Sequence, residues 1–117
     1  MEGRDPNSLL PLTDLAFNLL VVLSGKPLHG YALLKELRVR IGRDALRTGT
    51  VYAALARLQD SGLVGEVEVR PTSDSSDERR RVYQLTALGT AVARAEAQRL
   101  REVLHFAGQK NLVEGGS

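Results

Sequence analysis

The side chains best suited to molecular recognition lie on one face of the stretch formed by residues 48–64. At 100° per residue, Thr50, Ala53 and Arg57 share one side of a helix, and Tyr52 lies on its flank. Threonine and arginine can hydrogen-bond to base edges, and alanine can contact a thymine methyl group. A solvated helix would normally carry Glu and Lys on this side. The pattern therefore favours a recognition helix that enters the major groove of DNA.

The same stretch carries the signals of a self-contained helix. Thr48 is a good N-cap residue because its hydroxyl can accept a hydrogen bond from a free amide of the first turn. Gly62 can adopt the left-handed conformation that ends helices. Between them, Val51, Leu55 and Leu58 follow the spacing of an apolar stripe that faces a core. We expect one buried face and one face free for a partner.

Residues for catalysis or metal binding are scarce. The chain has no cysteine, and His29 and His105 are far apart, with no carboxylate pair at metal-binding spacing beside either. The sequence contains no nucleophile elbow, no phosphate-binding loop and no histidine-centred acid–base group. We expect no enzymatic activity, no metal and no cofactor.

Size and composition indicate a single small globular domain. The 117 residues are 43% hydrophobic and 26% charged, which allows one modest core. There is no apolar run of transmembrane length and no signal peptide, so we expect a cytoplasmic protein without a membrane partner. The absence of cysteine fits a reducing compartment.

The distribution of charge is more informative than the net charge of +2. Thirteen of the sixteen basic residues are arginine, which suits forked recognition of phosphate or guanine. Codon bias in a high-GC genome explains most of this ratio. It does not explain where the arginines lie.

A first helix is expected to begin at Thr13, with Asp14 in its first turn, and to continue to Leu23. Its circumference is mostly apolar, which suggests burial on more than one side. A dimer contact that includes Leu19 would provide such burial. Residues 1–12 contain two prolines and no sustained period, so we expect a flexible N-terminal arm.

A second helix is expected over residues 29–41, with Gly42 just past its end. A short loop joins it to the recognition stretch. This order predicts a helix-turn-helix, in which the second helix enters the groove and the first lies across the backbone.

The period changes from helical to alternating after the recognition stretch. Val67 and Val69 alternate with glutamates, and the alternation resumes at Tyr83 and Leu85, which predicts a two-stranded hairpin. The long polar tip between the strands ends in Arg79, Arg80 and Arg81. A hairpin at this place is the wing of a winged helix, and we expect its arginines to contact phosphates.

The last element is expected to begin at the cap Thr86 and to continue to about residue 108, followed by a flexible tail at 109–117. Its apolar stripe is too long for a small core to cover. We therefore expect it to pair with a second subunit in a two-fold dimer. The expected contact residues on this helix are Ala93, Ala97, Leu100, Val103, Leu104 and Ala107.

Three blocks resemble the PadR family of bacterial transcriptional regulators over residues from about 13 to 105. They are Leu28-His29-Gly30-Tyr31-Ala32-Leu33, then Gly49-Thr50-Val51-Tyr52 with Leu58 and Gly62-Leu63-Val64, then Arg81-Val82-Tyr83-Gln84-Leu85-Thr86 followed by Gly89. The order and spacing of the blocks are more specific than any one of them.

The resemblance implies a winged-helix repressor that dimerises through its C-terminal helix and is sometimes released from DNA by a small effector. It places Gly30 and Tyr31 near the DNA backbone, Thr50 and Tyr52 at the groove, and Arg81 and Tyr83 in the wing. Ala53 stands where the family often has proline, and Val82 stands where a second wing tyrosine is common. These departures leave the sequence specificity open. The single C-terminal helix suggests a short-tailed branch with little room for an effector domain.

The prediction is a mainly α protein with a small β-hairpin: a winged helix-turn-helix domain at residues 13–86 and a dimerisation helix at 87–108. Its function would be that of a homodimeric repressor on a two-fold operator in double-stranded DNA. Two alternatives are an effector-gated repressor with a pocket at the dimer interface and a protein-interaction module without DNA binding. The predicted DNA-binding residues are Tyr31, Lys35, Arg47, Thr48, Thr50, Tyr52, Ala53, Arg57, Arg79, Arg80, Arg81 and Tyr83.

Overall fold

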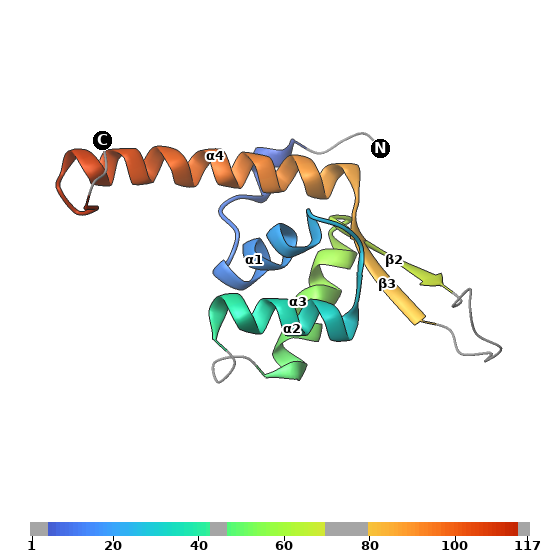
Figure 1. Ribbon diagram of the computed structural model, residues 1–117. Helices are drawn as coiled ribbons and strands as arrows, with labels where there is room; N and C mark the ends of the chain where they lie inside the picture. The colour runs from blue at the N-terminus through green and yellow to red at the C-terminus, as the bar shows by residue number, and fades with distance from the viewer. Residues whose placement is uncertain (1–4, 43–46, 70–79, 115–117) are drawn as a thin grey trace.

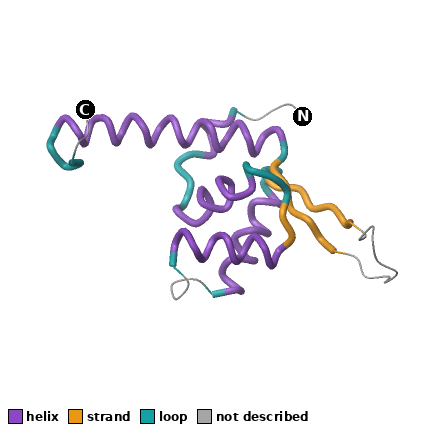
Figure 2. The backbone as a smooth tube through the Cα atoms, in the orientation of Figure 1, coloured by secondary structure: helices purple, strands orange, loops and turns teal. Residues whose placement is uncertain are grey.

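The computed structural model describes residues 5–42, 47–69 and 80–114 (Figure 1). Helices gather into one bundle, a hairpin extends from one side, and the last helix crosses the bundle and continues past it (Figure 2). This arrangement confirms the predicted winged helix-turn-helix fold. In chain order the elements are η1, a 3-10 helix (Pro6–Leu9), α1 (Asp14–Leu23), β1 (Leu28–His29), α2 (Gly30–Ile41), α3 (Thr48–Asp60), β2 (Val64–Val69), β3 (Arg80–Leu85) and α4 (Ala87–Gln109).

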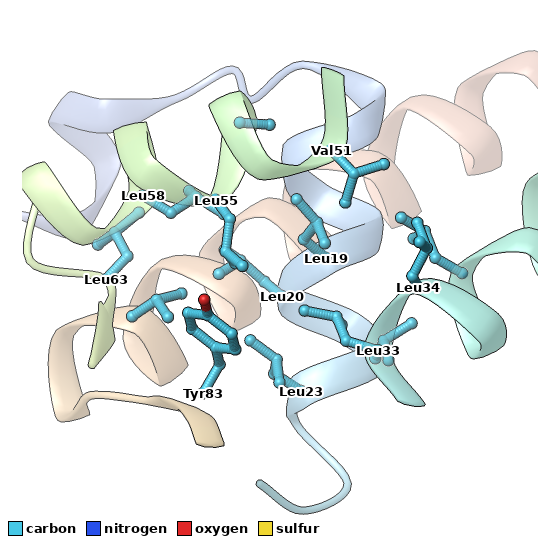
Figure 3. Packing of buried hydrophobic residues seen from close by; sticks show 14 of the residues in the cluster. Leu19, Leu20, Leu23, Leu33, Leu34, Val51, Leu55, Leu58, Leu63 and Tyr83 are labelled. Carbon is cyan, nitrogen blue, oxygen red and sulfur yellow. The ribbon is translucent and has the colours of Figure 1, made fainter. Parts of the chain in front are cut away.

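The hydrophobic core forms around α1, which contacts α2, α3 and α4. Leu19 and Leu20 of α1 are completely buried, together with Leu33 of α2 and Leu55 of α3 (Figure 3). Full burial of a leucine side chain stabilises a fold by about 1.5–3 kcal/mol. The prediction of Leu19 as a dimer contact is wrong, because the core of its own chain already covers this side chain.

Two of the three predicted helix caps are confirmed. The hydroxyl of Thr13 accepts from the amide of Ala16 at 3.1 Å, and that of Thr86 accepts from the amide of Gly89 at 3.0 Å. Thr48 is not a cap, because it is the first residue of α3 and Arg47 occupies the N-cap position without a side-chain hydrogen bond.

The end of α3 has the expected glycine. Gly62 has a φ of 80°, and its amide donates to the carbonyl of Gln59 at 3.0 Å. The next amide, that of Leu63, donates to the carbonyl of Leu58 at 2.9 Å. These paired bonds form a Schellman motif, which directs the chain from α3 into β2.

Within the described residues the sheet has three antiparallel strands in the order β1-β3-β2, one more than predicted. Leu28 and His29 pair with Tyr83 and Val82, so the start of α2 is fixed to the base of the hairpin. A strand of two residues is too short for an alternating pattern, which explains why the sequence did not reveal it.

The chain before α1 packs on α4, which differs from the arm expected over residues 1–12. η1 contacts α4, and Leu12 is partly buried against the core. The backbone amide of Leu12 donates to the carboxylate of Glu96 at 3.2 Å. Glu96 is only 2% exposed and also accepts hydrogen bonds from Arg99 at 2.6 and 3.0 Å. Residues 1–4 of the expected arm lie outside the described part of the chain.

The substitution Glu96→Gln is expected to lower the free energy of unfolding by about 2 kcal/mol at neutral pH, since charged hydrogen bonds are the stronger ones. The hydrogen bonds from Arg99 lower the pKa of Glu96 against the effect of burial, and the Leu12 amide lowers it further. Because the pKa of Glu96 is lowered in the folded state, its carboxylate stabilises the fold at pH values above the unfolded-state pKa. This contribution is lost as the pH falls through the folded-state pKa. Urea unfolding should therefore separate the two proteins at neutral pH and bring them together in strong acid. An equal difference in the free energy of unfolding at neutral pH and in strong acid would contradict the stabilising role of the Glu96 carboxylate.

Candidate nucleic-acid interface

The face of α3 that points away from the core is built as the sequence predicted. Thr50, Ala53 and Arg57 are exposed, whereas Val51 and Leu55 on the other side are buried. Asp60 in the last turn is the one acidic residue of this helix. The outer face of α3 therefore presents small side chains in the first turns and the cation Arg57 in the last turn, three residues before Asp60.

The tyrosines beside this face have different surroundings. A Cβ at Gly30 would overlap the hydroxyl of Tyr52, so Gly30 leaves room for the phenol at the first turn of α2. Tyr52 is 38% exposed, whereas Tyr31 is 77% exposed. Tyr52 is thus held between α3 and α2, and Tyr31 is open to a partner.

The remaining predicted residues of the helix-turn-helix lie near the junction of α2 and α3. Lys35, Arg47 and Thr48 are exposed. The hydroxyl of Thr48 accepts a hydrogen bond from Nη2 of Arg38 at 3.3 Å. Arg38 is not among the residues predicted to bind DNA. The sequence feature that could have identified it is its position beside Leu34 and Leu37, because a long basic side chain there flanks the buried stripe of α2.

Of the three arginines predicted in the wing, the structure describes the side chain of Arg81. Arg81 is exposed, and its Nη1 lies 2.8 Å from the carboxylate of Glu66 across the hairpin. The same carboxylate accepts from the side-chain amide of Gln59 at 2.7 Å. Arg80 lies in β3 opposite Val69, and Arg79 lies outside the described residues. An acidic neighbour therefore partly neutralises the one arginine of this cluster whose side chain is described.

Tyr83 belongs to the core and not to the exposed surface of the wing. It is 8% exposed and lies among Leu20, Leu23 and Leu63 (Figure 3). Burial raises the pKa of its phenol, with a smaller contribution from Glu66. The prediction of Tyr83 as a DNA contact is corrected accordingly, because a base or phosphate cannot reach a side chain packed in the core.

The substitution Glu66→Gln is expected to strengthen non-specific DNA binding, because it releases Arg81 and removes a negative charge from the wing. The slope of log affinity against log salt should become steeper by up to about one unit. Fluorescence anisotropy on scrambled DNA at several salt concentrations measures this slope. The matched control is Glu102→Gln on α4, which makes the same charge change away from the hairpin and should leave the slope unchanged. An unchanged slope in both variants would exclude Arg81 as a phosphate contact.

The predicted dimer residues of α4 divide into two groups. Ala93 packs against the core of its own chain, and Ala107 is half-buried. Ala97 is exposed, and the larger side chains beyond it leave much of their apolar surface in solvent. The exposed fractions are 38% for Leu100, 52% for Val103 and 58% for both Leu104 and Phe106. This half of α4 extends beyond the bundle (Figure 1).

No group of three His, Cys, Asp or Glu side chains in the described part of the chain could hold a metal ion. Among the described helices, none has the length and apolar character needed to cross a bilayer.

A helical bundle with an exposed third helix and a following hairpin defines the class of winged helix-turn-helix proteins. Residues 19–95 match the transcriptional regulator PadR-like family, and the chain belongs to this family. No curated protein matches the chain.

Solved structures of the same family resemble the fold. A PadR family transcription regulator from Clostridium difficile R20291 is 27% identical with a TM-score of 0.69, covering 81% of this chain and 95% of that one. A PadR-like regulator from Bacillus cereus is 24% identical with a TM-score of 0.68, covering 86% and 92%. Bacillus subtilis PadR, solved in complex with operator DNA, is 20% identical with a TM-score of 0.58, covering 77% of this chain and 48% of that one.

Proposed function

We propose that this protein is a homodimeric repressor that binds a two-fold symmetric operator in the cytoplasm. The observation that carries the proposal is the outer face of α3, where Thr50, Ala53 and Arg57 are exposed together on a helix whose other side is buried. Small side chains allow the backbone of α3 to approach the floor of a major groove. Threonine, alanine and arginine then supply hydrogen bonds and apolar contact to base edges.

The dimer would form through the free half of α4. Monomeric proteins rarely expose large contiguous apolar patches, and such patches commonly mark association surfaces. Leu100, Val103, Leu104 and Phe106 are all partly or largely exposed on this part of α4. A two-fold axis there would present two copies of α3 to successive major grooves about 34 Å apart.

Binding of the dimer to the operator is sufficient for repression. A dimer that covers two neighbouring half-sites excludes other proteins from the same DNA, so no enzymatic step and no cofactor are needed. Membership of the PadR-like family supports a regulatory role. The Bacillus subtilis relative, which was solved with operator DNA, supports the proposed binding of operator DNA because it shares the fold.

Fluorescence anisotropy with DNA from upstream of the protein's own gene tests the proposal, beside scrambled DNA of equal length at two salt concentrations. Tight binding to the upstream DNA alone would support a specific regulator. Equal and strongly salt-dependent binding to both would indicate backbone contacts only and place the operator elsewhere. No binding to either DNA would contradict the proposal and favour a protein-interaction module.

Effector gating is a second candidate, and the feature that favours it is a cleft away from the predicted dimer interface. A cleft of about 550 Å³ lies within one chain, where the α1–β1 turn, the end of β3 and the start of α4 meet. Its lining includes Leu23, Pro27 and Leu85 together with Lys26 and Arg94. This size is typical of ligand sites. A ligand that binds the folded protein but not the unfolded chain must raise the melting temperature. A thermal-shift screen of small organic acids therefore tests this candidate.

A further inference from the structure

The junction between α2 and α3 holds an arginine that the proposed interface does not yet use. Arg38 belongs to the last turn of α2, and its Nη2 donates to Oγ1 of Thr48 in the first turn of α3 at 3.3 Å. This contact joins the two helices of the helix-turn-helix across their connecting turn.

The hydrogen bonding of Arg38 is incomplete. Its side chain is half-buried, and Nε is buried without a hydrogen-bond partner among the described residues. A buried donor without a partner costs about 1–3 kcal/mol, so stability of the free protein is a poor reason for this placement. An arginine has five N–H donors, and among the residues that the structure describes the bond to Thr48 uses one of them. Because the side chain is only half-buried, donors other than Nε remain for an acceptor from outside the chain.

Two further cations lie beside Arg38. Lys35 is one helical turn earlier on α2 and shares its side of the helix, and Arg47 directly precedes Thr48. Both are exposed, and neither forms a salt bridge with a carboxylate within the ranges that the structure describes. The amino-terminal end of the α3 dipole adds partial positive charge at the same place. In the wing, by contrast, Glu66 partly neutralises Arg81.

We propose that Arg38 binds a DNA backbone phosphate and at the same time positions the first turn of α3 through Thr48. The inference rests on the proposed DNA-binding function and deepens it. The remaining donors of the guanidinium bind phosphate oxygens, and Lys35 and Arg47 add attraction for the same segment of backbone. Arg38 is thus a positioning residue for Thr50 and Ala53, which face the bases.

Three substitutions separate the phosphate contact from the positioning. Arg38→Ala should reduce the slope of log affinity against log salt by about one unit on any DNA. Arg38→Lys keeps the charge but lacks the planar fork, so it should keep the slope and lower the ratio of operator to scrambled-DNA affinity about fivefold. Thr48→Val removes the acceptor hydroxyl without a change of charge and should lower this ratio to a similar extent.

Arg40→Ala is the matched control, because it removes the same charge from the same turn of α2. It should leave the ratio and most of the slope unchanged. Far-ultraviolet circular dichroism and urea unfolding show whether each variant is folded. An unchanged slope in Arg38→Ala, or an equal change in Arg40→Ala, would overturn the phosphate contact. An unchanged ratio of operator to scrambled-DNA affinity in both Arg38→Lys and Thr48→Val would overturn the role of Arg38 in positioning α3.

The wild-type protein distinguishes failure of this inference from failure of the proposed function. If it binds DNA with a clear salt dependence and the variants do not differ from it, only the role of Arg38 is wrong. If it binds neither operator nor scrambled DNA, the proposed function and the role of Arg38 are both wrong.

Discussion

The Gly89→Ala variant is expected to lose about 3 kcal/mol or more of its free energy of unfolding, enough to leave a small domain largely unfolded at elevated temperature. A Cβ at position 89 would overlap the backbone carbonyl of Leu63. That carbonyl cannot move away freely, because it accepts from the amide of Thr86 at 3.1 Å. The Thr86 hydroxyl also donates to the carbonyl of Gly62 at 2.6 Å. The start of α4 is therefore fixed to the turn after α3 by backbone contacts that an added methyl group would break.

Urea unfolding followed by circular dichroism measures this loss. The matched control is Gly49→Ala in α3, because a Cβ at Gly49 meets no atom within 4 Å. Alanine there should be neutral or should stabilise the helix by up to about 1 kcal/mol. A Gly89→Ala protein as stable as the wild type would show that the contact between α4 and the α3–β2 turn is looser than the structure indicates.

The Leu104→Glu variant is expected to be monomeric and to lose about 100-fold or more in affinity for an operator with two half-sites. Leu104 is 58% exposed in the single chain, so glutamate there should not disturb the fold. In the proposed dimer the same position lies in an apolar contact, where an unpaired charge is costly. Loss of the dimer removes the gain of roughly 10²–10⁴ in affinity that comes from linking two binding sites.

Analytical ultracentrifugation and anisotropy on DNA with one or two half-sites measure both effects. Binding to a single half-site should be nearly unchanged, which separates loss of the dimer from loss of the DNA-binding surface. Gln98→Glu is the control, since it introduces the same charge at an exposed position outside the apolar stripe of α4. A Leu104→Glu protein that remains dimeric would exclude this part of α4 as the subunit interface.

The helices were predictable because their signals are local. The caps at Thr13 and Thr86, the glycine at position 62 and the apolar stripe of α3 all act within a few turns of the same element. A stripe such as Val51, Leu55 and Leu58 must be buried, whatever packs on it, so the opposite face had to be free. The candidate recognition face of α3 could therefore be located without knowledge of the fold.

The strands and individual contacts were less predictable. Alternation shows that Tyr83 and Val82 point to opposite faces of β3, but only the position of the bundle decides which face is inside. The resemblance to other regulators placed Tyr83 in the wing, and the packing of α1 and α3 placed its side chain in the core. β1 exists because Leu28 and His29 meet β3, a contact between distant parts of the chain.

The fold class, the order of the elements and the exposed face of α3 could be predicted from the sequence, because periodicity and capping depend on neighbours along the chain. Four features depend on tertiary packing: Leu19 is buried in the core, Glu96 accepts from the amide of Leu12, Glu66 pairs with Arg81, and Arg38 donates to Thr48. These side chains come from different elements or from opposite strands. Their pairing depends on the angles and distances at which the elements pack, and no local pattern in the sequence records those quantities.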